Sequence, residues 1–516
     1  MKLLSTLLLL IASISLLSAQ GEHELIIEPG PPGTLDQTII GDTTSTGERA
    51  DPDRVYILRR GTPYLTSQRI RWGDYHIRIK SEEGDGPRPM IIFSPDVGGE
   101  GIGQVLRLNS GAHLTLDGIH LQCRDLVGNF SDNAIRIGGE NARITINNCV
   151  VEEADQAGLR LDAVGLKVYI TNSIFNRMGL PTNPNNGRFL DNRGHPMDTI
   201  WVENCVIYDV TSRIYRHSGA GHINYGRFNQ NTFWGVGQHG ISLSPSNNLM
   251  FTNNIVANPV FLGYEKSMPE YAITIDTFVS GEDNINVSFN NFFVDDDHVG
   301  ALPDTNFLGD TILPVTNTMF GPNISNAIME TASATTNISE LLAFSDAPNL
   351  PSQFINANHN DTLVDDILAD AGEWDFSDLS PDDTYSGLGL GDIERFTTWH
   401  NFSYPEGAVS YTAGSEGQKL GADLSNIDTD IEEDYFISNN LLYYPNPVSD
   451  ELFIQNLDQS ALKTVGIYDL SGLLLRQQKV DAIYTRFQLG DLPKGTYVLT
   501  VRDQSGKVSS RKIVKH

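Results

Sequence analysis

The chain has 516 residues, and its formal net charge at pH 7 is −30. This acidic surplus excludes nucleic acid as the expected partner, because binding to a phosphate backbone requires a basic surface. Acidic residues concentrate between residues 301 and 439, where only Arg395 and Lys419 are basic. Such a charge-rich stretch is typical of solvated capping or linker segments.

The first 20 residues are typical of a secretory signal peptide. Lys2 supplies the positive start, residues 3–17 form the apolar stretch, and Ser18, Ala19 and Gln20 form a small-residue cleavage region. The apolar stretch is too short to span a membrane, and no later stretch approaches the necessary length. We therefore expect an exported protein without a transmembrane segment.

A short phrase recurs through the middle of the chain: alternating apolar residues, an asparagine, a small residue and two apolar residues. Its asparagines are 22 to 38 residues apart, and they are Asn148, Asn172, Asn204, Asn231, Asn253 and Asn291. This period is typical of the coils of a parallel β-helix. We predict an all-β protein with a right-handed parallel β-helix over residues 21–425, whose irregular capping coils begin near residue 300. A β-sandwich with coincidental spacing is the alternative.

The recurring asparagines predict a ladder at one turn of each coil. Asparagine tolerates a positive φ, and asparagines stacked coil on coil can bond to one another and satisfy buried turn amides. The residue after each asparagine should then point inward and be small. The residues predicted at this inward position are Cys149, Ser173, Cys205 and Thr232.

Strands with period-two alternation precede each turn of this kind. Their aliphatic residues should face the core, and the residue between them should face solvent. The predicted outward column is Arg107, Arg136, Arg160, Asn224, Ser242 and Thr274.

A separate domain follows an acidic linker at residues 426–439. Residues 440–516 alternate short apolar strands with Asp/Ser/Gly and Pro/Lys/Gly turns, which predicts a small antiparallel β-sandwich. Its characteristic motif residues are Tyr444, Pro445, Asn446, Pro447, Lys494, Gly495 and Tyr497.

These motifs closely resemble the C-terminal sorting domain of type IX secretion substrates in Bacteroidetes-type bacteria. The resemblance covers the whole of residues 440–516. It implies that the type IX secretion machinery is a partner, and that the protein crosses the periplasm to the outer cell surface or the medium. It says nothing about catalysis. The alternative is an ordinary surface sandwich module.

The densest group of chemically active side chains lies between residues 188 and 239, on coils with large insertions. A uronate lyase needs cations to neutralise the substrate carboxylate and a base to remove the adjacent proton. The candidate catalytic residues are Arg213, Arg216, His217 and His222, and Tyr215 is a further candidate base. The candidate substrate-binding residues are Arg107, Arg136, Arg160, Arg188, Arg193, His195, Tyr225, Arg227 and His239. The alternative is a set of solvated Arg–Asp pairs and surface histidines without a catalytic role.

Residues 221–256 resemble polysaccharide lyase family six, which acts on alginate and chondroitin with a pectin-lyase-like β-helix. The shared pattern of alternating strands and asparagines includes Asn231-Thr232-Phe233, residues 241–244 and Asn253. The resemblance places the catalytic lysine of that family near Gly226 and its arginine near Ser244. Neither position is basic here, so a lyase site in this chain would use Arg213, Arg216 or the histidines instead.

The sequence therefore favours an extracellular protein that acts on an acidic polysaccharide, with β-elimination as the expected chemistry. A non-catalytic glycan-binding or adhesive surface protein is the alternative. No cofactor is certain, although calcium is possible, because hard cations prefer carboxylate oxygens. The candidate acidic groups are Asp295–Asp297, Asp365–Asp366 and Asp382–Asp383.

Overall fold

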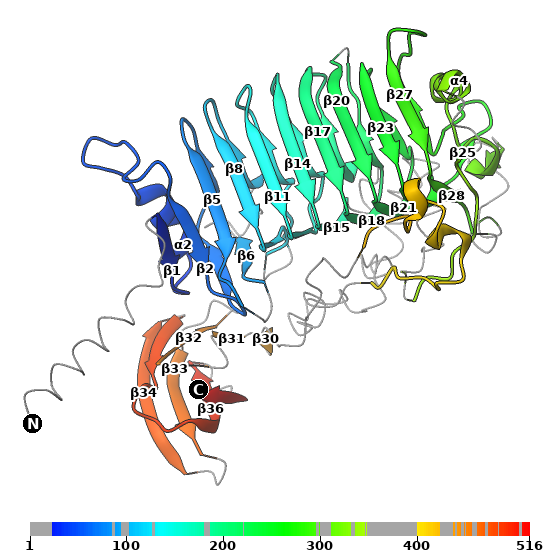
Figure 1. Ribbon diagram of the computed structural model, residues 1–516. Coiled ribbons are helices and arrows are strands. Elements are labelled where there is room, and N and C mark those ends of the chain that lie inside the picture. The colour runs from blue at the N-terminus through cyan, green and yellow to red at the C-terminus, as the bar shows by residue number, and fades with distance from the viewer. Residues whose placement is uncertain are drawn as a thin grey trace, which may run out of the picture.

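The chain forms a long solenoid of stacked strands and a smaller C-terminal domain (Figure 1). The computed structural model describes residues 23–84, 88–93, 103–125, 129–179, 186–219, 221–295, 299, 311–331, 336–345, 347, 400–423, 437–438, 441–444, 448, 450–456, 462–469, 473–482, 484–504 and 508–515. The proposed signal peptide, most of the proposed linker and Pro445–Pro447 lie outside the described residues.

Three parallel sheets run along the solenoid, and each coil contributes a strand to each of them in turn. The ten-stranded sheet consists of β1 (Glu24–Ile27), β2 (Val55–Leu58), β5 (His76–Ser81), β8 (His113–Asp117), β11 (Arg143–Asn147), β14 (Leu166–Thr171), β17 (Met197–Glu203), β20 (Ile223–Asn229), β23 (Asn248–Thr252) and β27 (Asn284–Ser288). The nine-stranded sheet consists of β3 (Pro63–Thr66), β6 (Met90–Phe93), β9 (His120–Gln122), β12 (Val150–Glu152), β15 (Ile174–Met178), β18 (Val206–Val210), β21 (Thr232–Val236), β24 (Ile255–Pro259) and β28 (Asn291–Phe293). The eight-stranded sheet consists of β4 (Ile70–Trp72), β7 (Gln104–Leu108), β10 (Asn133–Ile137), β13 (Ala157–Leu161), β16 (Arg188–Asn192), β19 (Arg213–Arg216), β22 (Ile241–Leu243) and β26 (Ile273–Ile275).

The predicted parallel β-helix is confirmed, and its core follows from the period-two alternation. Leu108, Ile137 and Leu161 occupy the same register on successive strands, and all three are fully buried. Stacking like aliphatic residues coil on coil fills the interior without cavities.

Two helices cover the ends of this core. In α2 (Thr34–Gly41), Leu35 and Ile39 pack into the core at the N-terminal end. In α4 (Pro322–Thr331), Ile324 and Ile328 do the same beside β26 and β27. Covering the last strand of a sheet prevents it from pairing with another chain. The short elements η2 (Val315–Asn317), β25 (Tyr264–Glu265) and β29 (Ile312–Leu313) lie in this C-terminal part of the solenoid sequence.

The asparagine ladder lies at the turn between the ten-stranded and nine-stranded sheets. Asn148, Asn172 and Asn204 adopt the left-handed conformation there, with φ between 51° and 54°. Asparagine adopts this conformation at lower cost than most residues. In the next coil, Gln230 occupies the left-handed position, and Asn231 occupies the following, inward position that Cys205 holds one coil earlier. The bonded asparagines of the later coils therefore lie one residue further along than Asn204.

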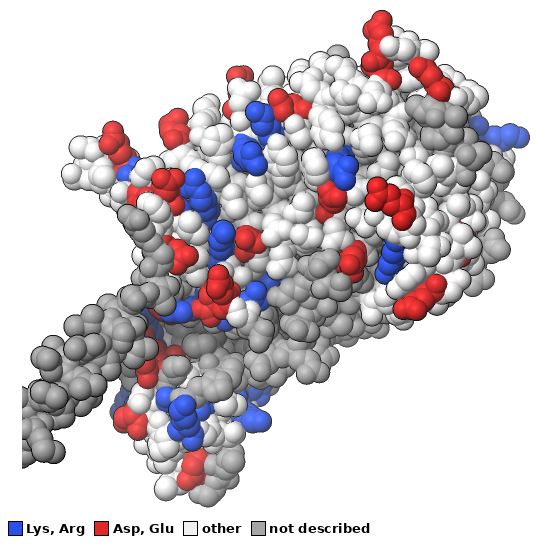
Figure 2. All heavy atoms as spheres, in the orientation of Figure 1, with Lys and Arg blue, Asp and Glu red and all other residues white. Residues whose placement is uncertain are grey.

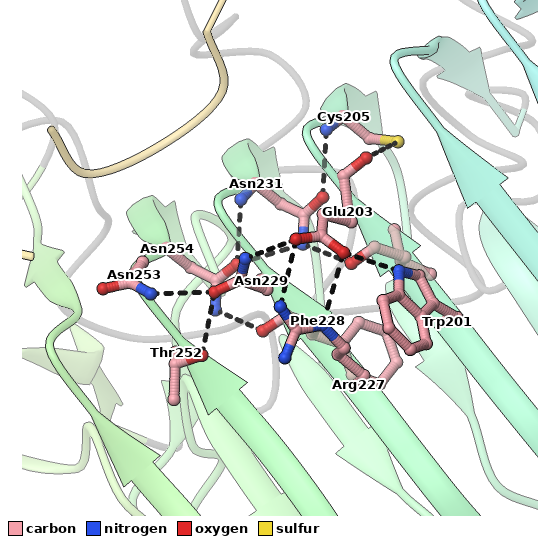
Figure 3. A network of polar contacts seen from close by, with 11 residues as sticks. Trp201, Glu203, Cys205, Arg227, Phe228, Asn229, Asn231, Thr252, Asn253 and Asn254 are labelled. Atoms are coloured by element: carbon pink, nitrogen blue, oxygen red, sulfur yellow. Dashed lines mark hydrogen bonds and ion pairs between the residues drawn. The ribbon is translucent and has the colours of Figure 1, made fainter. Parts of the chain in front are cut away.

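The shifted asparagines form a continuous buried ladder in the later coils (Figure 3). The Oδ1 of Asn254 accepts hydrogen bonds from the backbone N–H of Asn231 at 2.9 Å and from its Nδ2 at 3.0 Å. The Nδ2 of Asn254 donates to the Oδ1 of Asn290 at 3.0 Å, and Asn290 donates in the same way to Asn337 at 2.9 Å. Each side chain thereby satisfies the backbone of the coil before it.

This shift corrects one prediction. Cys149, Ser173 and Cys205 are fully buried at the inward position, as expected. Thr232, however, is in register with Val206 rather than Cys205, and its Oγ1 accepts a hydrogen bond from the backbone N–H of Ala422 at 3.1 Å. It therefore faces away from the solenoid core. The asparagine phrase alone could not show which of two adjacent positions each asparagine occupies.

The segment 400–423, which contains η6 (Val409–Tyr411) and η7 (Ser415–Gly417), packs along the outer face of the nine-stranded sheet. Its Phe402 and Leu420 bury the outward side chains of Ile174 and Trp234. The left-handed asparagines hold its backbone: Asn253 Oδ1 accepts from Ser415 N–H at 2.8 Å. One broad face of the solenoid is therefore occupied by the chain itself.

The C-terminal domain is an antiparallel sandwich, as predicted. One sheet contains β30 (Ile437–Ser438), β31 (Leu441–Tyr444), β32 (Glu451–Asn456) and β35 (Tyr484–Gln488), and the other contains β33 (Leu462–Tyr468), β34 (Leu474–Ala482), β36 (Gly495–Asp503) and β37 (Val508–Lys515). Leu452 and Ile454 of the first sheet share a core with Val465 and Leu499 of the second. The motif residue Tyr497 is buried, and its hydroxyl donates to the carbonyl of Pro493 at 2.6 Å, whereas Lys494 is exposed.

Candidate functional site

The solvent side of the eight-stranded sheet carries a column of arginines. In the strand register, Arg71 pairs with Arg107, Arg107 with Arg136, and Arg136 with Arg160. The predicted alignment of Arg107, Arg136 and Arg160 is confirmed, and Arg71 extends it by one coil. We call these four residues the arginine column.

On the next strand, β16, the register position of the column is occupied by an acid, because Arg160 is in register with Asp191. On β19 it is occupied by an arginine again, because Asp191 is in register with Arg216. Asn224 was expected in this column, but it lies on β20 in the ten-stranded sheet, so that prediction was wrong. The alternation of apolar residues around Asn224 looks the same in either sheet, and the strand that occupies the expected place in the eight-stranded sheet is β19. Ser242 and Thr274 pair with each other on the last two strands, as expected.

A single carboxylate links two members of the arginine column. Asp162 accepts hydrogen bonds from the Nε of Arg136 at 2.6 Å and from the Nε of Arg160 at 3.1 Å. Within the described part of the chain, the Nη atoms of these two side chains make no hydrogen bond. Burial and the neighbouring Arg136 hold the pKa of Arg107 below its usual range. A second carboxylate, Asp132, also feels the charges of Arg160 and Arg136, which oppose the rise of its pKa on burial. The four arginines of the column therefore still outnumber the carboxylates Asp162 and Asp132.

Asp191 organises a second group of arginines. Its carboxylate is almost fully buried and lies 3.7 Å from Arg188 Nη1, 3.4 Å from Arg193 Nη1 and 3.5 Å from Arg216 Nη1. Burial lowers the pKa of Arg188 to about 10, against the attraction of Asp191. Three of the candidate residues are thus brought together, and they share one buried carboxylate. Such a network fixes the arginines in place.

Arg213 and His239 meet around another carboxylate, Glu270. The Nδ1 of His239 lies 2.7 Å from Glu270 Oε1. Burial lowers the pKa of Arg213 to about 10, and the charge of Glu270 opposes this shift. Arg213 lies on β19, two coils beyond Arg160 in the same eight-stranded sheet, and His239 lies just before β22 of that sheet.

His217 follows Arg216 directly and is held at both ring nitrogens. Its Nδ1 lies 2.9 Å from the Oγ of Ser244, and its Nε2 lies 3.7 Å from Asp276 Oδ2. Burial lowers the pKa of His217, with Asp276 opposing the shift. The imidazole is therefore neutral near pH 7 and able to accept a proton. Although serine, histidine and aspartate lie in a row, Ser244 is fully buried and cannot act as a nucleophile toward a polymer.

Tyr215 is not a candidate base, which corrects that prediction. Its ring is fully buried inside the solenoid, where its hydroxyl accepts a hydrogen bond from Asn192 Nδ2 at 2.7 Å. Burial raises the pKa of Tyr215 to about 12. On β19, Tyr215 is in register with the buried Leu190 and faces the core, whereas Arg216 is in register with Asp191.

The remaining candidates lie elsewhere. His222 is bonded to Asn224 at 3.0 Å where β20 begins, and Tyr225 and Arg227 lie on β20 itself. His195 lies in the turn that leads to β17, where its carbonyl accepts from Asn192 at 3.2 Å. The ten-stranded sheet therefore holds two of the candidate binding residues, Tyr225 and Arg227, and His222 directly precedes its strand β20.

The two positions suggested by the lyase resemblance do not form a site. Gly226 is buried on β20, where an added Cβ would lie 3.0 Å from the side chain of Leu249. Ser244 is also buried, after β22 in a different sheet. The spacing shared with the lyase family is the general spacing of the β-helix coils. It therefore does not indicate that Gly226 and Ser244 face a common site.

Among the described residues, no group of three or more His, Cys, Asp or Glu side chains is arranged to hold a metal ion. Asp295 is described, whereas the other aspartates proposed as calcium ligands lie outside the described residues.

Sequence reasoning missed the acidic partners Asp162, Glu270 and Asp276, as well as Arg71. Arg71 was detectable, since Ile70-Arg71-Trp72 has the same apolar–Arg–apolar alternation as the predicted column. The acids were not, because the contacts of Asp162 with Arg136, of Glu270 with His239 and of Asp276 with His217 join different coils of irregular length.

Comparison with known proteins identifies the C-terminal domain. Residues 442–516 match the family model of the secretion system C-terminal sorting domain. No curated protein matches the chain. Within the described part of the chain, no helix is long and apolar enough to cross a membrane. The protein is a substrate of the type IX secretion system and is exported to the cell surface or the extracellular space.

Proposed function

We propose that this exported β-helix protein binds an acidic polysaccharide along the arginine column. The supporting observation is the column itself: four arginines on successive coils, with one carboxylate, Asp162, shared by Arg136 and Arg160. Adjacent strands lie about 4.8 Å apart. This advance is comparable to one sugar unit of an extended polysaccharide, so successive carboxylates could each meet one guanidinium.

Arginine suits this task because its planar guanidinium pairs with a carboxylate through two parallel hydrogen bonds. The Nε atoms of Arg136 and Arg160 are used by Asp162, which orients both side chains before a ligand arrives. Pre-orientation reduces the entropy that binding would otherwise cost.

The test is the double variant Arg136→Ala/Arg160→Ala. Each lost charge-assisted contact is worth about 1.5 kcal/mol or more in protected sites and less when exposed. We expect affinity for immobilised polygalacturonate or alginate to fall roughly tenfold to a hundredfold. Biolayer interferometry at two salt concentrations would measure this, and binding should weaken as salt rises.

A matched control removes two exposed charges from the sorting domain. The variant Lys463→Ala/Arg502→Ala changes the net charge by the same amount and should bind like the parent protein. Equal affinity of parent protein and column variant, or equal binding of an uncharged glucan, would contradict the proposal.

A second candidate function, uronate lyase, is favoured by His217. Its neutral imidazole follows Arg216, which carries the charge needed to neutralise a uronate carboxylate. In β-elimination, the neutral imidazole of His217 would remove the proton beside the carboxylate. The C–H electron pair would form the ring double bond, and the bond to the next sugar oxygen would break, with that oxygen taking up a proton.

We expect purified protein to raise the ultraviolet absorbance of one acidic substrate, and His217→Ala to lower the rate by about a hundredfold or more. His195→Ala is the control, since His195 lies in a turn and touches none of the clustered arginines in the described contacts. Absence of an unsaturated product on alginate, pectate and chondroitin would leave binding as the function.

A further inference from the structure

The outer face of the ten-stranded sheet carries a second cationic surface, separate from the arginine column. Between β8 and β20, the outward positions near the strand starts hold several cations and aromatic rings, together with threonines and one carboxylate, Asp198 at the bulge of β17. We call the following six residues the cation–aromatic face: Arg143, Lys167, Tyr169, Trp201, Tyr225 and Arg227.

The aromatic rings of this face form a row across three strands. Tyr169 is in register with Trp201, and Trp201 lies 6.2 Å from Tyr225, centroid to centroid. The indole is fixed, because its Nε1 donates to Glu203 Oε2 at 2.6 Å (Figure 3). Guanidinium groups lie over two of the rings, Arg143 at 4.6 Å from the Tyr169 centroid and Arg227 at 4.7 Å from that of Trp201.

The cations of this face differ in how they are neutralised. Arg227 is paired with Glu203 at 3.0 Å. Arg143 and Lys167 are direct neighbours in the strand register, and within the described residues neither has a carboxylate within ion-pair distance. Two like charges side by side repel each other unless an anion lies between them. Figure 2 shows this side of the solenoid, where basic and acidic side chains are scattered among mostly uncharged atoms.

We propose that the cation–aromatic face binds a second chain of acidic polysaccharide, so that one protein molecule bridges two chains. The apolar faces of the sugar rings would stack on the row of Tyr169, Trp201 and Tyr225. The acidic groups would pair with Arg143 and Lys167. Fixed rings and unpaired cations on one flat surface match a ligand that alternates apolar ring faces with negative charge.

Two separate sheets carry the two surfaces, so their occupation need not be exclusive. The arginine column lies on the eight-stranded sheet and the cation–aromatic face on the ten-stranded sheet. Bridging rests on the proposed function of the column, whereas binding at the cation–aromatic face does not. A bridging protein with two sites also gains avidity on a dense polymer.

The test separates the two surfaces in one assay. Full-length protein is loaded on polygalacturonate beads, washed, and then offered fluorescent polygalacturonate. We expect the parent protein to capture the labelled chain. The variant Arg143→Ala/Lys167→Ala should stay on the beads through the column but capture about tenfold less label. The conservative variant Arg143→Lys/Lys167→Arg should restore capture and report that folding is intact.

The column variant Arg136→Ala/Arg160→Ala is the reciprocal control, since it should also stay on the beads, through the other face, and lose capture. Full capture by Arg143→Ala/Lys167→Ala would overturn the inference while leaving the column function standing. So would complete loss of bead retention in the column variant, because a single binding surface would then remain. If the column variant is retained on the beads and captures labelled polygalacturonate as the parent protein does, the proposed function of the column is contradicted.

Discussion

Replacing Asn254 by alanine should destabilise the solenoid by about 3–5 kcal/mol, far more than an ordinary surface substitution. The Asn254 side chain accepts two hydrogen bonds from Asn231, through its backbone N–H and its Nδ2. It also donates to the carbonyl of Phe228 at 3.0 Å. Alanine would leave these groups buried without partners, and each such group costs roughly 1–3 kcal/mol.

Urea unfolding followed by circular dichroism would measure the free energy of unfolding of this variant. The control is Asn284→Ala, the same substitution at an exposed asparagine whose side chain, among the described residues, hydrogen-bonds only to Asn248, at 3.4 Å. We expect less than about 0.5 kcal/mol for the control. A similar small effect for both variants would mean that water replaces the buried ladder bonds, against the expectation.

The sequence was sufficient to predict the parallel β-helix because its coils repeat the same physical requirements. Each turn needs a residue that tolerates positive φ, and each strand needs aliphatic residues at alternate positions. Asn148, Asn172 and Asn204 met the first requirement where expected. The one-residue shift at Asn231 could not be predicted, since both the left-handed and the inward position favour asparagine for different hydrogen bonds.

The candidate site was predictable only where strand alternation controls it. Arg107, Arg136 and Arg160 were aligned correctly, because side chains two residues apart on a strand share a face. Asp162, which orients Arg136 and Arg160, was missed. Its contact with Arg136 crosses from one coil to the next, and the insertions that set the coil lengths give no periodic signal.

The cation–aromatic face shows a different limit of prediction from the sequence. Tyr225 and Arg227 were selected, but Tyr169 and Trp201 were passed over as ordinary strand residues, although they share one register with Arg227. Strand alternation places Tyr169 and Trp201 outward, but it does not show which side chains of other coils lie beside them. Only the stacking of strands from different coils brings these rings into a row.

A buried charge cluster in the middle of the nine-stranded sheet, at β9, β12 and β15, should respond most strongly to pH. The side chains of Arg177, Glu152 and Glu153 are 1% exposed or less. The Nη1 of Arg177 lies 3.6 Å from Glu153 Oε1 and 3.8 Å from Glu152 Oε2, and Gln122 donates to Glu153. Burial raises the pKa of Glu153 to about 7, against the attraction of Arg124 and Arg177.

The sign of the pH effect follows from that shift. A buried carboxyl whose folded pKa lies above its unfolded value of 4.5 stabilises the fold below pH 4.5, and this contribution disappears as pH rises to about 7. Without Arg177, the folded pKa of Glu153 would rise further. The loss of stability would then continue above pH 7.

We therefore expect Arg177→Met to cost about 3–5 kcal/mol at pH 8 and clearly less at pH 5, where Glu153 is protonated in the folded state. Methionine keeps the chain length, and neither residue is favoured at the positive φ of 52°, so the substitution tests charge. Chemical unfolding at both pH values would measure the difference. Adding Glu153→Gln should recover much of the loss at pH 8, whereas Arg486→Met, at an exposed ion pair with Glu451, should cost less than about 0.5 kcal/mol at either pH. An equal penalty for Arg177→Met at pH 5 and pH 8 would show that the arginine acts through packing alone.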